Sequence, residues 1–366
     1  MDDRSALRYA QGGIVPLDGE TLRVQESRYP TMRIISTLAL TPAQEKLLAQ
    51  ASGGAELNHR ACRGVDEIAE LLTTGCDALL TFRMPDDVAT RTPGLKWIQL
   101  LSAGADHTPK HLISSGALAV TTASGIHATP IAEYTLASML AYAHNLHVTM
   151  RAQMRRTWMR NWEFMDTVDE LRGKTLGVIG YGSIGRETAR LAAAFGMTVI
   201  ALKRDPAMHA DPGWWPPGLG DPEGVIPARW YGPEQRVEAV SESDYLTITL
   251  PATPHTRKFI GVREIAAMKP GAYIVNIGRG EVIDERALID ALRAKKIGGA
   301  GLDVFEQEPL PAESPLWDLE NVILTPHMSG ACKSYMDKAC ELFAENLRHF
   351  RAGEPLLNLV DPTQGY

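Results

Sequence analysis

The sequence lacks the features that would assign it to several protein classes. No apolar stretch reaches the roughly 18 residues that a bilayer span needs. The start, from Met1 to Ser5, is polar and has no apolar signal-peptide core, so we expect a cytoplasmic protein. The formal net charge of −7 shows no basic excess, and neither nucleic acid nor an anionic membrane is an expected partner.

Cysteine is also scarce. The four cysteines form no C-x-x-C pair and match no zinc spacing, so no metal is expected: they are Cys62, Cys76, Cys332 and Cys340. We expect them to be reduced thiols in the core. The length of 366 residues, with 45% hydrophobic and 22% charged residues, is typical of an ordinary globular protein with two domains.

Residues 175–203 read as a strand, a glycine turn, a helix and a second strand. Gly180, Gly182 and Gly185 have G-x-G-x-x-G spacing directly after the first apolar run. The first glycine permits a tight turn, the second lets the backbone approach a pyrophosphate, and the third lets the helix pack against the strand. The helix N-terminus then faces the phosphates with unpaired N–H groups. The context predicts dinucleotide binding and disfavours a glycine-rich turn that binds nothing.

The residues after the second strand indicate which dinucleotide binds. An acidic residue there would hold the ribose 2′-hydroxyl of NAD, whereas this chain has Lys203 and Arg204. Two cations attract a 2′-phosphate, and arginine can grip it with two hydrogen bonds. We therefore favour NADP(H), with NAD(H) still possible, because the pair is also compatible with solvated surface cations and Asp205 follows it.

The chain before residue 125 alternates strand and helix patterns, which predicts a small α/β domain with a parallel sheet. The expected strands are 32–37, 76–82 and 95–101, and the expected helices are 42–51 and 65–73. The last strand runs into a loop of small residues, 102–106. Backbone N–H groups of Ala103 and Gly104 are suited to a substrate carboxylate, although a simple tight turn explains the loop equally well.

The rest of the chain predicts a second sheet. A long helix is expected from Thr129 to about Met150, with Glu133 in its first turn. Further strands are expected at 245–250, 272–277, 297–303 and 322–324, with helices at 285–294 and 333–351, the latter returning to the first domain.

Two segments have no clear periodicity. Residues 1–30 read as an extended arm. Residues 211–233 are rich in Trp, Pro and Gly and too long for an ordinary connection. They fit a loop over the adenosine, a subunit contact or a passive insertion.

Arg279, Glu308 and His327 stand at or just beyond strand ends, which converge on one crevice in a doubly wound sheet. Together with a dinucleotide they suit carbonyl reduction. An imidazole exchanges a proton near neutral pH, so His327 can protonate the carbonyl oxygen. Glu308 would orient the ring, and Arg279 would hold a carboxylate. Taken singly, each has a structural explanation, such as a surface ion pair or a core histidine.

At these residues the chain resembles the D-isomer-specific 2-hydroxyacid dehydrogenase family. The matching stretches are Gly180-Tyr-Gly-Ser-Ile-Gly185, Asn276-Ile-Gly-Arg-Gly280, Asp303-Val-Phe-Glu-Gln-Glu-Pro309, Thr325-Pro-His327 and the Ser102–Asp106 loop. The resemblance covers about 31–355. It implies an α/β fold of two doubly wound parallel sheets: a flavodoxin-like substrate domain, 1–124 plus 329–366, and an inserted Rossmann dinucleotide-binding domain, 125–328.

The resemblance also implies site residues and a homodimer. The catalytic residues would be Arg279, Glu308 and His327, and the substrate-binding residues Ser102, Ala103, Gly104 and Arg279. The cofactor-binding residues would be Gly180, Tyr181, Gly182, Ser183, Ile184, Gly185, Lys203, Arg204, Pro251, Thr256, Ile277, Gly278, Arg279, Asp303, His327 and Gly330, with Asp303 at the carboxamide end of the nicotinamide.

Three departures from the family pattern stand out. Lys203 replaces the acidic residue of the NAD-type members, as in the NADP-using ones, and segments 1–30 and 211–233 are expected to be additions. Glu308 argues against the formate-oxidising branch, which has Gln there.

Two functions follow from the sequence. The first is hydride transfer between NADP(H) and a small 2-oxo or 2-hydroxy acid of D configuration, in the reducing direction, with glyoxylate or hydroxypyruvate as possible substrates. The second is a dinucleotide-sensing corepressor-like binding protein of the same fold with little turnover.

Overall fold

The computed structural model describes residues 32–105, 108–114, 118–211 and 213–361. The arm expected over 1–30 lies outside the described residues, as does Asp106 of the small-residue loop. No helix of the described part combines the length and apolarity that a membrane span requires.

The first sheet has five parallel strands in the order β2-β1-β3-β4-β5, the flavodoxin-like order. They are β1 Arg33–Ser36, β2 Glu56–His59, β3 Ala78–Thr81, β4 Trp97–Leu100 and β5 Ala119–Thr121. The helices between them are α1 Pro42–Ser52, α2 Val65–Leu72, α3 Val88–Arg91 and α4 Lys110–Ser114. The apolar side chains of the strands alternate between two cores, one beneath α1 and the other beneath α2, α3 and α4.

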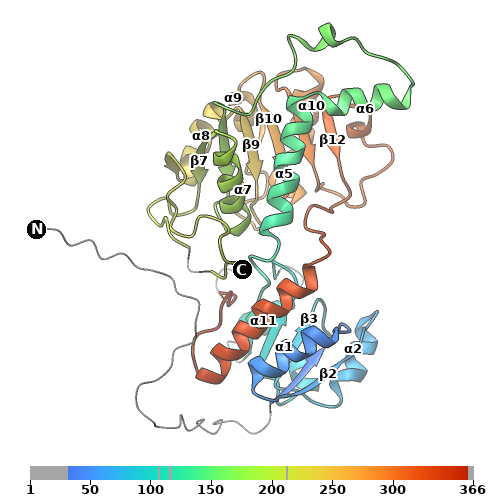
Figure 1. Cartoon of the computed structure of the whole chain (residues 1–366), viewed down its shortest axis with the longest axis vertical. Helices are drawn as coiled ribbons and strands as arrows, with labels where there is room; N and C mark the ends of the chain where they lie inside the picture. Colours follow the sequence, from blue (N-terminus) through green and yellow to red (C-terminus); the bar gives the residue numbers. More distant parts are fainter. Residues whose placement is uncertain (1–31, 106–107, 115–117, 212, 362–366) are drawn as a thin grey trace, which may run out of the picture. The chain divides into compact units, whose positions relative to one another are not determined.

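The C-terminal helix packs on the first domain, as predicted. Helix α11, Tyr335–Ala352, packs against α1 (Figure 1). The Phe343 ring lies 4.8 Å from the ring of Trp97, which is fully buried on β4. Residues from both ends of the described chain therefore share one hydrophobic core.

The second sheet has seven parallel strands in the order β12-β11-β10-β9-β6-β7-β8. They are β6 Thr175–Ile179, β7 Thr198–Leu202, β8 Arg229–Tyr231, β9 Tyr245–Ile248, β10 Tyr273–Asn276, β11 Gly299–Leu302 and β12 Val322–Leu324. The order reverses at β6, so the carboxyl ends of β6 and β9 flank the crevice where such sheets bind ligands. The predicted fold class, two doubly wound parallel sheets, is confirmed.

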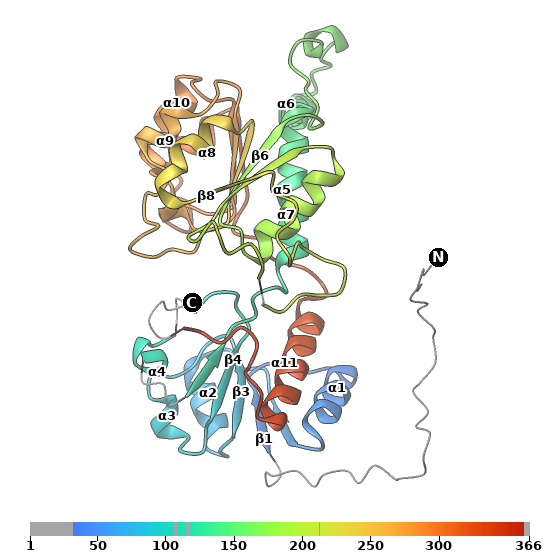
Figure 2. The same ribbon diagram turned by 90° about the vertical axis from the view of Figure 1, so that its left-hand side faces the viewer.

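Helices cover both faces of the second sheet (Figures 1 and 2). One face packs against α5, Ala128–Ala143, and α7, Ser183–Ala194, which lie side by side. The other face packs against α8 Arg236–Glu242, α9 Val262–Ala267 and α10 Glu285–Arg293. The remaining helices are α6 Leu146–Met154 and the short 3₁₀ helices η1 Asn161–Phe164, η2 Pro233–Gln235, η3 Gly280–Val282 and η4 Pro315–Asp318.

Several sequence-based expectations were wrong in detail. The helix expected from Thr129 to Met150 is two helices, because Asn145 adopts a left-handed φ of 53° between α5 and α6. Glu133 lies beyond the first turn of α5. Segment 211–233, expected to lack regular structure, contains the edge strand β8.

The cysteines also differ from expectation. Cys76 and Cys340 are buried free thiols, whereas Cys62 and Cys332 are free but only partly buried. The four are therefore not all core residues.

Candidate active site

The glycine turn after β6 has the geometry that a dinucleotide needs. Gly180 has a φ of +101°, and a Cβ on Gly185 would lie 2.4 Å from the Gly180 carbonyl oxygen. Only glycine fits the first position without strain and the third without a clash. At Gly182, which caps the N-terminus of α7, a Cβ would meet no atom within 4 Å, so its backbone is open to a ligand. These residues fit the pyrophosphate of a dinucleotide.

The other residues of the turn lie differently. Ser183 begins α7, and its Oγ lies 3.4 Å from Ser124 Oγ. Ile184 packs at the edge of the core beneath α5 and α7. The Tyr181 side chain is buried and its hydroxyl donates to Asp221 at 2.8 Å, so a contact with the cofactor would come from its backbone.

Lys203 and Arg204 follow β7 at its carboxyl end. Lys203 Nζ donates to the Met208 carbonyl at 2.6 Å, and Arg204 is exposed. Asp205 Oδ1 accepts from the Ala207 backbone N–H at 3.0 Å. One carboxylate oxygen of Asp205 is thus engaged in its own turn, and its negative charge stands beside the two positive charges of this strand end.

Glu308 and His327, separated in sequence, are in contact. Glu308 Oε2 lies 2.7 Å from His327 Nδ1, while Oε1 accepts from the Phe305 backbone N–H at 3.1 Å. The His327 side chain is 49% exposed, so the ring is accessible to a ligand. His327 has a φ of 52°, in the left-handed region, which histidine enters more often than most non-glycine residues do.

Asp303 holds the turn that carries His327. Its fully buried carboxylate accepts from Met328 N and Ser329 N, both at 2.9 Å, and from Thr325 Oγ1 at 2.6 Å. Tyr134 of α5 contacts Thr325 Oγ1 at 2.7 Å through its hydroxyl. The sequence did not predict these hydrogen bonds, because the motif that contains Asp303 does not indicate which donors surround its carboxylate. Contact of Asp303 with the nicotinamide stays a prediction.

The loop of Arg279 is pressed against the segment that carries Glu308. A Cβ on Gly280 would lie 1.9 Å from the Phe305 carbonyl carbon, so only glycine allows this approach. Gly278 likewise lies against the Leu250 backbone, and Ile277 is buried. Arg279 Nη1 donates to the Gly278 carbonyl at 2.9 Å.

The small-residue loop is held by groups that sequence reasoning did not identify. Ser102 Oγ donates to the Gly104 carbonyl at 2.8 Å, and Ala103 is exposed. The Tyr335 hydroxyl donates to the Leu101 carbonyl and lies 3.1 Å from His127 Nε2. Nothing in the sequence pairs His127 with a tyrosine far along the chain.

His127 lies within the influence of the Arg279 charge. Burial, with smaller effects of Lys338 and Arg279, lowers the pKa of His127 to about 4. A Cβ on Gly330 would lie 3.2 Å from the His127 ring, so Gly330 borders the same group.

The remaining predicted cofactor residues form a turn after β9. Thr256 Oγ1 donates to the Pro251 carbonyl at 2.6 Å.

Among the described residues, no three His, Cys, Asp or Glu side chains gather to hold a metal.

The parallel seven-stranded sheet, its glycine turn and the Glu308–His327 pair define a dinucleotide-dependent oxidoreductase. The family model for the NAD-binding domain of D-isomer-specific 2-hydroxyacid dehydrogenases matches residues 136–216 and 221–329. The chain belongs to the D-isomer-specific 2-hydroxyacid dehydrogenase family and is an enzyme of that kind. Within segment 211–233 the match leaves out residues 217–220. That this segment is an addition to the family stays a prediction.

Individual relatives agree with this assignment. A glyoxylate reductase of Korarchaeum cryptofilum is 33% identical over 78% of this chain and 83% of its own length. A D-3-phosphoglycerate dehydrogenase of Methanocaldococcus jannaschii is 36% identical over 75% of this chain but only 49% of its own length. The crystal structure of a family member from Xanthobacter autotrophicus, in complex with NADPH and MES, superposes with a TM-score of 0.71 and 28% identity, covering 92% of this chain and 100% of that one.

Proposed function

We propose that this 2-hydroxyacid oxidoreductase uses NADPH to reduce a small 2-oxo acid to the D-2-hydroxy acid. The observation that carries the proposal is the 2.7 Å contact between Glu308 and His327, on a turn that Asp303 holds beside the second sheet. The dinucleotide, when bound, supplies the hydride, and the chain's own residues handle the substrate and the proton.

His327 is the proton donor in this proposal. Glu308 accepts from the Nδ1 side of the ring, which leaves Nε2 to give its proton to the carbonyl oxygen of the substrate. The contact also fixes the orientation of the ring. Arg279 holds the substrate carboxylate, assisted by the backbone N–H groups of Ala103 and Gly104.

The preference for NADPH is supported by the charges after β7. Lys203 and Arg204 supply two cations where the ribose 2′ position of a dinucleotide is expected. The reducing direction is proposed because cells keep the NADP pool reduced. The Xanthobacter structure was solved with NADPH, which agrees with the same choice.

We also propose that the chain is a two-domain homodimer, with its dinucleotide-binding domain inserted at about 125–328. Helix α6 buries none of its residues. Exposed large apolar side chains follow one another from α6 through η1: Met150, Met154, Trp158, Trp162 and Met165. Exposed apolar side chains of this size are typical of an interface, and a second copy of the chain is the partner that we propose for them.

The corepressor-like alternative is not favoured. The enzymatic motifs are all present, and the named relatives are enzymes: a glyoxylate reductase, a phosphoglycerate dehydrogenase and a sulfolactate dehydrogenase.

Steady-state rates with a panel of 2-oxo acids, each with NADPH and with NADH, test the proposal. We expect turnover with at least one small acid, such as glyoxylate or hydroxypyruvate, and a lower KM for NADPH than for NADH. Replacing Lys203→Asp together with Arg204→Ala should reverse that preference, because a carboxylate repels the 2′-phosphate. No turnover with any acid would end the proposal, and an unchanged NADPH affinity in the double variant would end the charge argument.

A further inference from the structure

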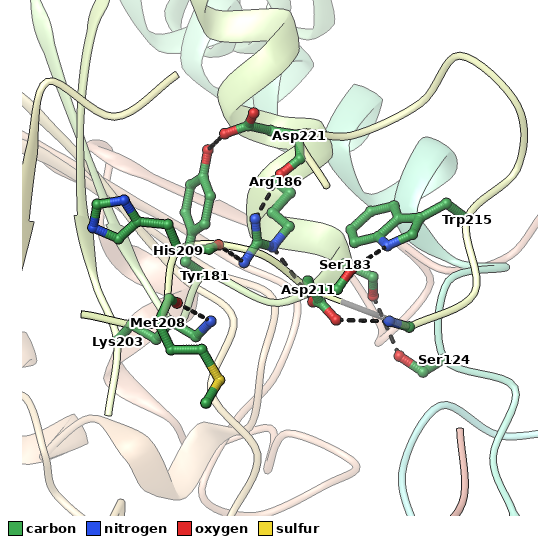
Figure 3. A network of polar contacts seen from close by, with 12 residues as sticks. Ser124, Tyr181, Ser183, Arg186, Lys203, Met208, His209, Asp211, Trp215 and Asp221 are labelled. Atoms are coloured by element: carbon green, nitrogen blue, oxygen red, sulfur yellow. Dashed lines mark hydrogen bonds and ion pairs between the residues drawn. The ribbon is translucent and has the colours of Figure 1, made fainter. Parts of the chain in front are cut away.

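Arg186 is a fully buried charge on the first turn of α7. Its guanidinium lies over the Tyr181 ring at 4.8 Å, and its hydrogen-bond acceptors come from one segment. This segment, here called the strap, comprises residues 205–228 without Pro212 and connects β7 to β8. Arg186 donates through Nη2 to the His209 carbonyl at 2.6 Å and through Nη1 to the Asp221 carbonyl at 2.5 Å (Figure 3). Its Nε lies 3.4 Å from Asp211 Oδ2. A buried guanidinium requires such partners, so Arg186 fixes the strap at His209, Asp211 and Asp221.

Further bonds tie the strap to the same helix and turn. The Tyr181 hydroxyl donates to Asp221 Oδ2 at 2.8 Å, and the Asp221 carboxylate also accepts from the backbone N–H groups of Val225 and Ile226. Glu187, nearly fully buried, accepts from the Gly220 N–H at 2.7 Å. The strap is therefore tied to the second sheet by specific hydrogen bonds, which a passive insertion would not need.

One end of the strap fixes Lys203. The Met208 carbonyl accepts from Lys203 Nζ at 2.6 Å, and the next carbonyl along the chain, that of His209, is the one that Arg186 holds (Figure 3). The His209 ring is stacked on Trp230 of β8, with the ring centres 4.5 Å apart. His209 is thus fixed by Arg186 at its carbonyl and by Trp230 at its ring. The position of His209 sets that of the neighbouring Met208 carbonyl, and so the place of the Lys203 ammonium.

This arrangement removes freedom that a lysine otherwise has. A lysine side chain is flexible, and holding it in one place has an entropic cost that a bound phosphate would have to offset. An ammonium has three donors, so one bond to Met208 leaves two for a ligand. We propose that Arg186, acting through the strap, positions Lys203 to bind the 2′-phosphate of NADP(H) and thereby sets the cofactor preference.

The charges nearby agree with this role. Burial and the positive charge of Arg186 lower the pKa of Lys203, while Asp211 and Asp205 act in the opposite direction. The positive charges of Arg186 and Lys203 repel each other, and a phosphate dianion beside Lys203 would offset that repulsion. Arg186 itself is fully buried and would not contact the cofactor, so it is a positioning residue.

A double-mutant cycle tests the inference, which rests on the NADPH preference proposed above. KM and kcat for NADPH and for NADH are measured for the wild type, Arg186→Met, Lys203→Met and the double variant. Each single substitution should raise the KM for NADPH about tenfold and should change the KM for NADH much less, because NADH has no 2′-phosphate. The double variant should be no worse than Lys203→Met alone, because Arg186 acts through that side chain.

Glu187→Gln is the matched control. It weakens the ion pair between Glu187 and Arg190 and the contact of Glu187 with the Gly220 N–H of the strap, neither of which involves Met208 or His209. Thermal stability should therefore fall while the ratio of the two KM values stays constant. Should Arg186→Met fail to fold, Arg186→Lys replaces it in the cycle. It keeps the buried positive charge but cannot donate to the His209 and Asp221 carbonyls at once, so we expect a smaller effect in the same direction.

The outcomes separate the inference from its premise. Equal effects of Arg186→Met on both cofactors, or the same effect with and without Lys203, would mean that Arg186 has only a structural role, and the inference would be wrong. If the wild type shows no preference for NADPH over NADH, the premise fails and the inference with it. If the preference exists and Lys203→Met leaves it intact, the premise stands and the inference is wrong.

Discussion

Replacing Asp303 with asparagine is the most direct test of how the candidate active site is held. The substitution keeps the size of the side chain and exchanges one acceptor oxygen for an NH₂ group. Oδ1 accepts from Thr325 and Met328, and Oδ2 accepts from Ser329, so in either orientation the amide nitrogen faces at least one donor. At least one hydrogen bond to a charged group is lost, and a buried N–H is left without its acceptor.

The expected cost follows from that count. The smallest loss is the bond from Ser329, and a hydrogen bond to a charged group contributes about 1.5–3 kcal/mol. We therefore expect the free energy of unfolding to fall by about 2–3 kcal/mol. Because His327 lies between Thr325 and Met328, the ring should also shift, and kcat should fall by a factor of about 10 to 100.

Urea unfolding followed by circular dichroism measures the first quantity, and NADPH absorbance with the best 2-oxo acid measures the second. Asp290→Asn is the matched control, since the same chemical change there affects only an exposed ion pair with Arg286 and should cost no more than about 0.5 kcal/mol. If Asp303→Asn behaved like this control in both assays, the hold on the His327 turn would have been misjudged.

Three further predictions concern separate parts of the molecule. His327→Ala should lower kcat by a factor on the order of 10² or more if the ring donates the proton, and an unchanged kcat would remove it from the mechanism. Burial lowers the pKa of His127 from 6.5 to about 4, so the unfolded chain binds this proton first and the free energy of unfolding should fall as pH drops through that window, by at most about 3 kcal/mol. Urea unfolding at several pH values should show a shallower decline in His127→Gln; the same decline would assign the effect to other groups. Replacing Trp158 and Trp162 with Ser should shift the oligomer towards monomer in light scattering, whereas an intact oligomer would place the interface elsewhere.

The main elements of the fold could be predicted because burial leaves a pattern in the sequence. Strands β1, β3 and β4 are apolar runs, and Thr41 and Gly53 mark the two ends of α1. Strand β2, Glu-Leu-Asn-His, was missed because an edge strand buries little and needs no apolar run. Strand β5, Ala-Val-Thr, was also missed; it forms the other edge of the sheet and has only two apolar residues.

The candidate site could be predicted less completely. The contact between Glu308 and His327 follows from two motifs at neighbouring strand ends. The buried partners of Asp303 and Arg186 do not, because a hydrogen bond between distant segments depends on how they pack. Nothing in the sequence of the strap indicates that the carbonyl groups of His209 and Asp221 accept hydrogen bonds from a buried guanidinium.

The packing of α11 against the first sheet has a consequence for how the chain is made. The core beneath α1 includes Phe343 and Leu347, which a ribosome adds only after every strand of the second sheet. Until then Trp97 has no ring of α11 against it, and an apolar face is left uncovered. The ribosome therefore finishes every strand of the second sheet before it adds α11, which covers the first sheet. During that interval the uncovered apolar face of the first sheet is available to chaperones.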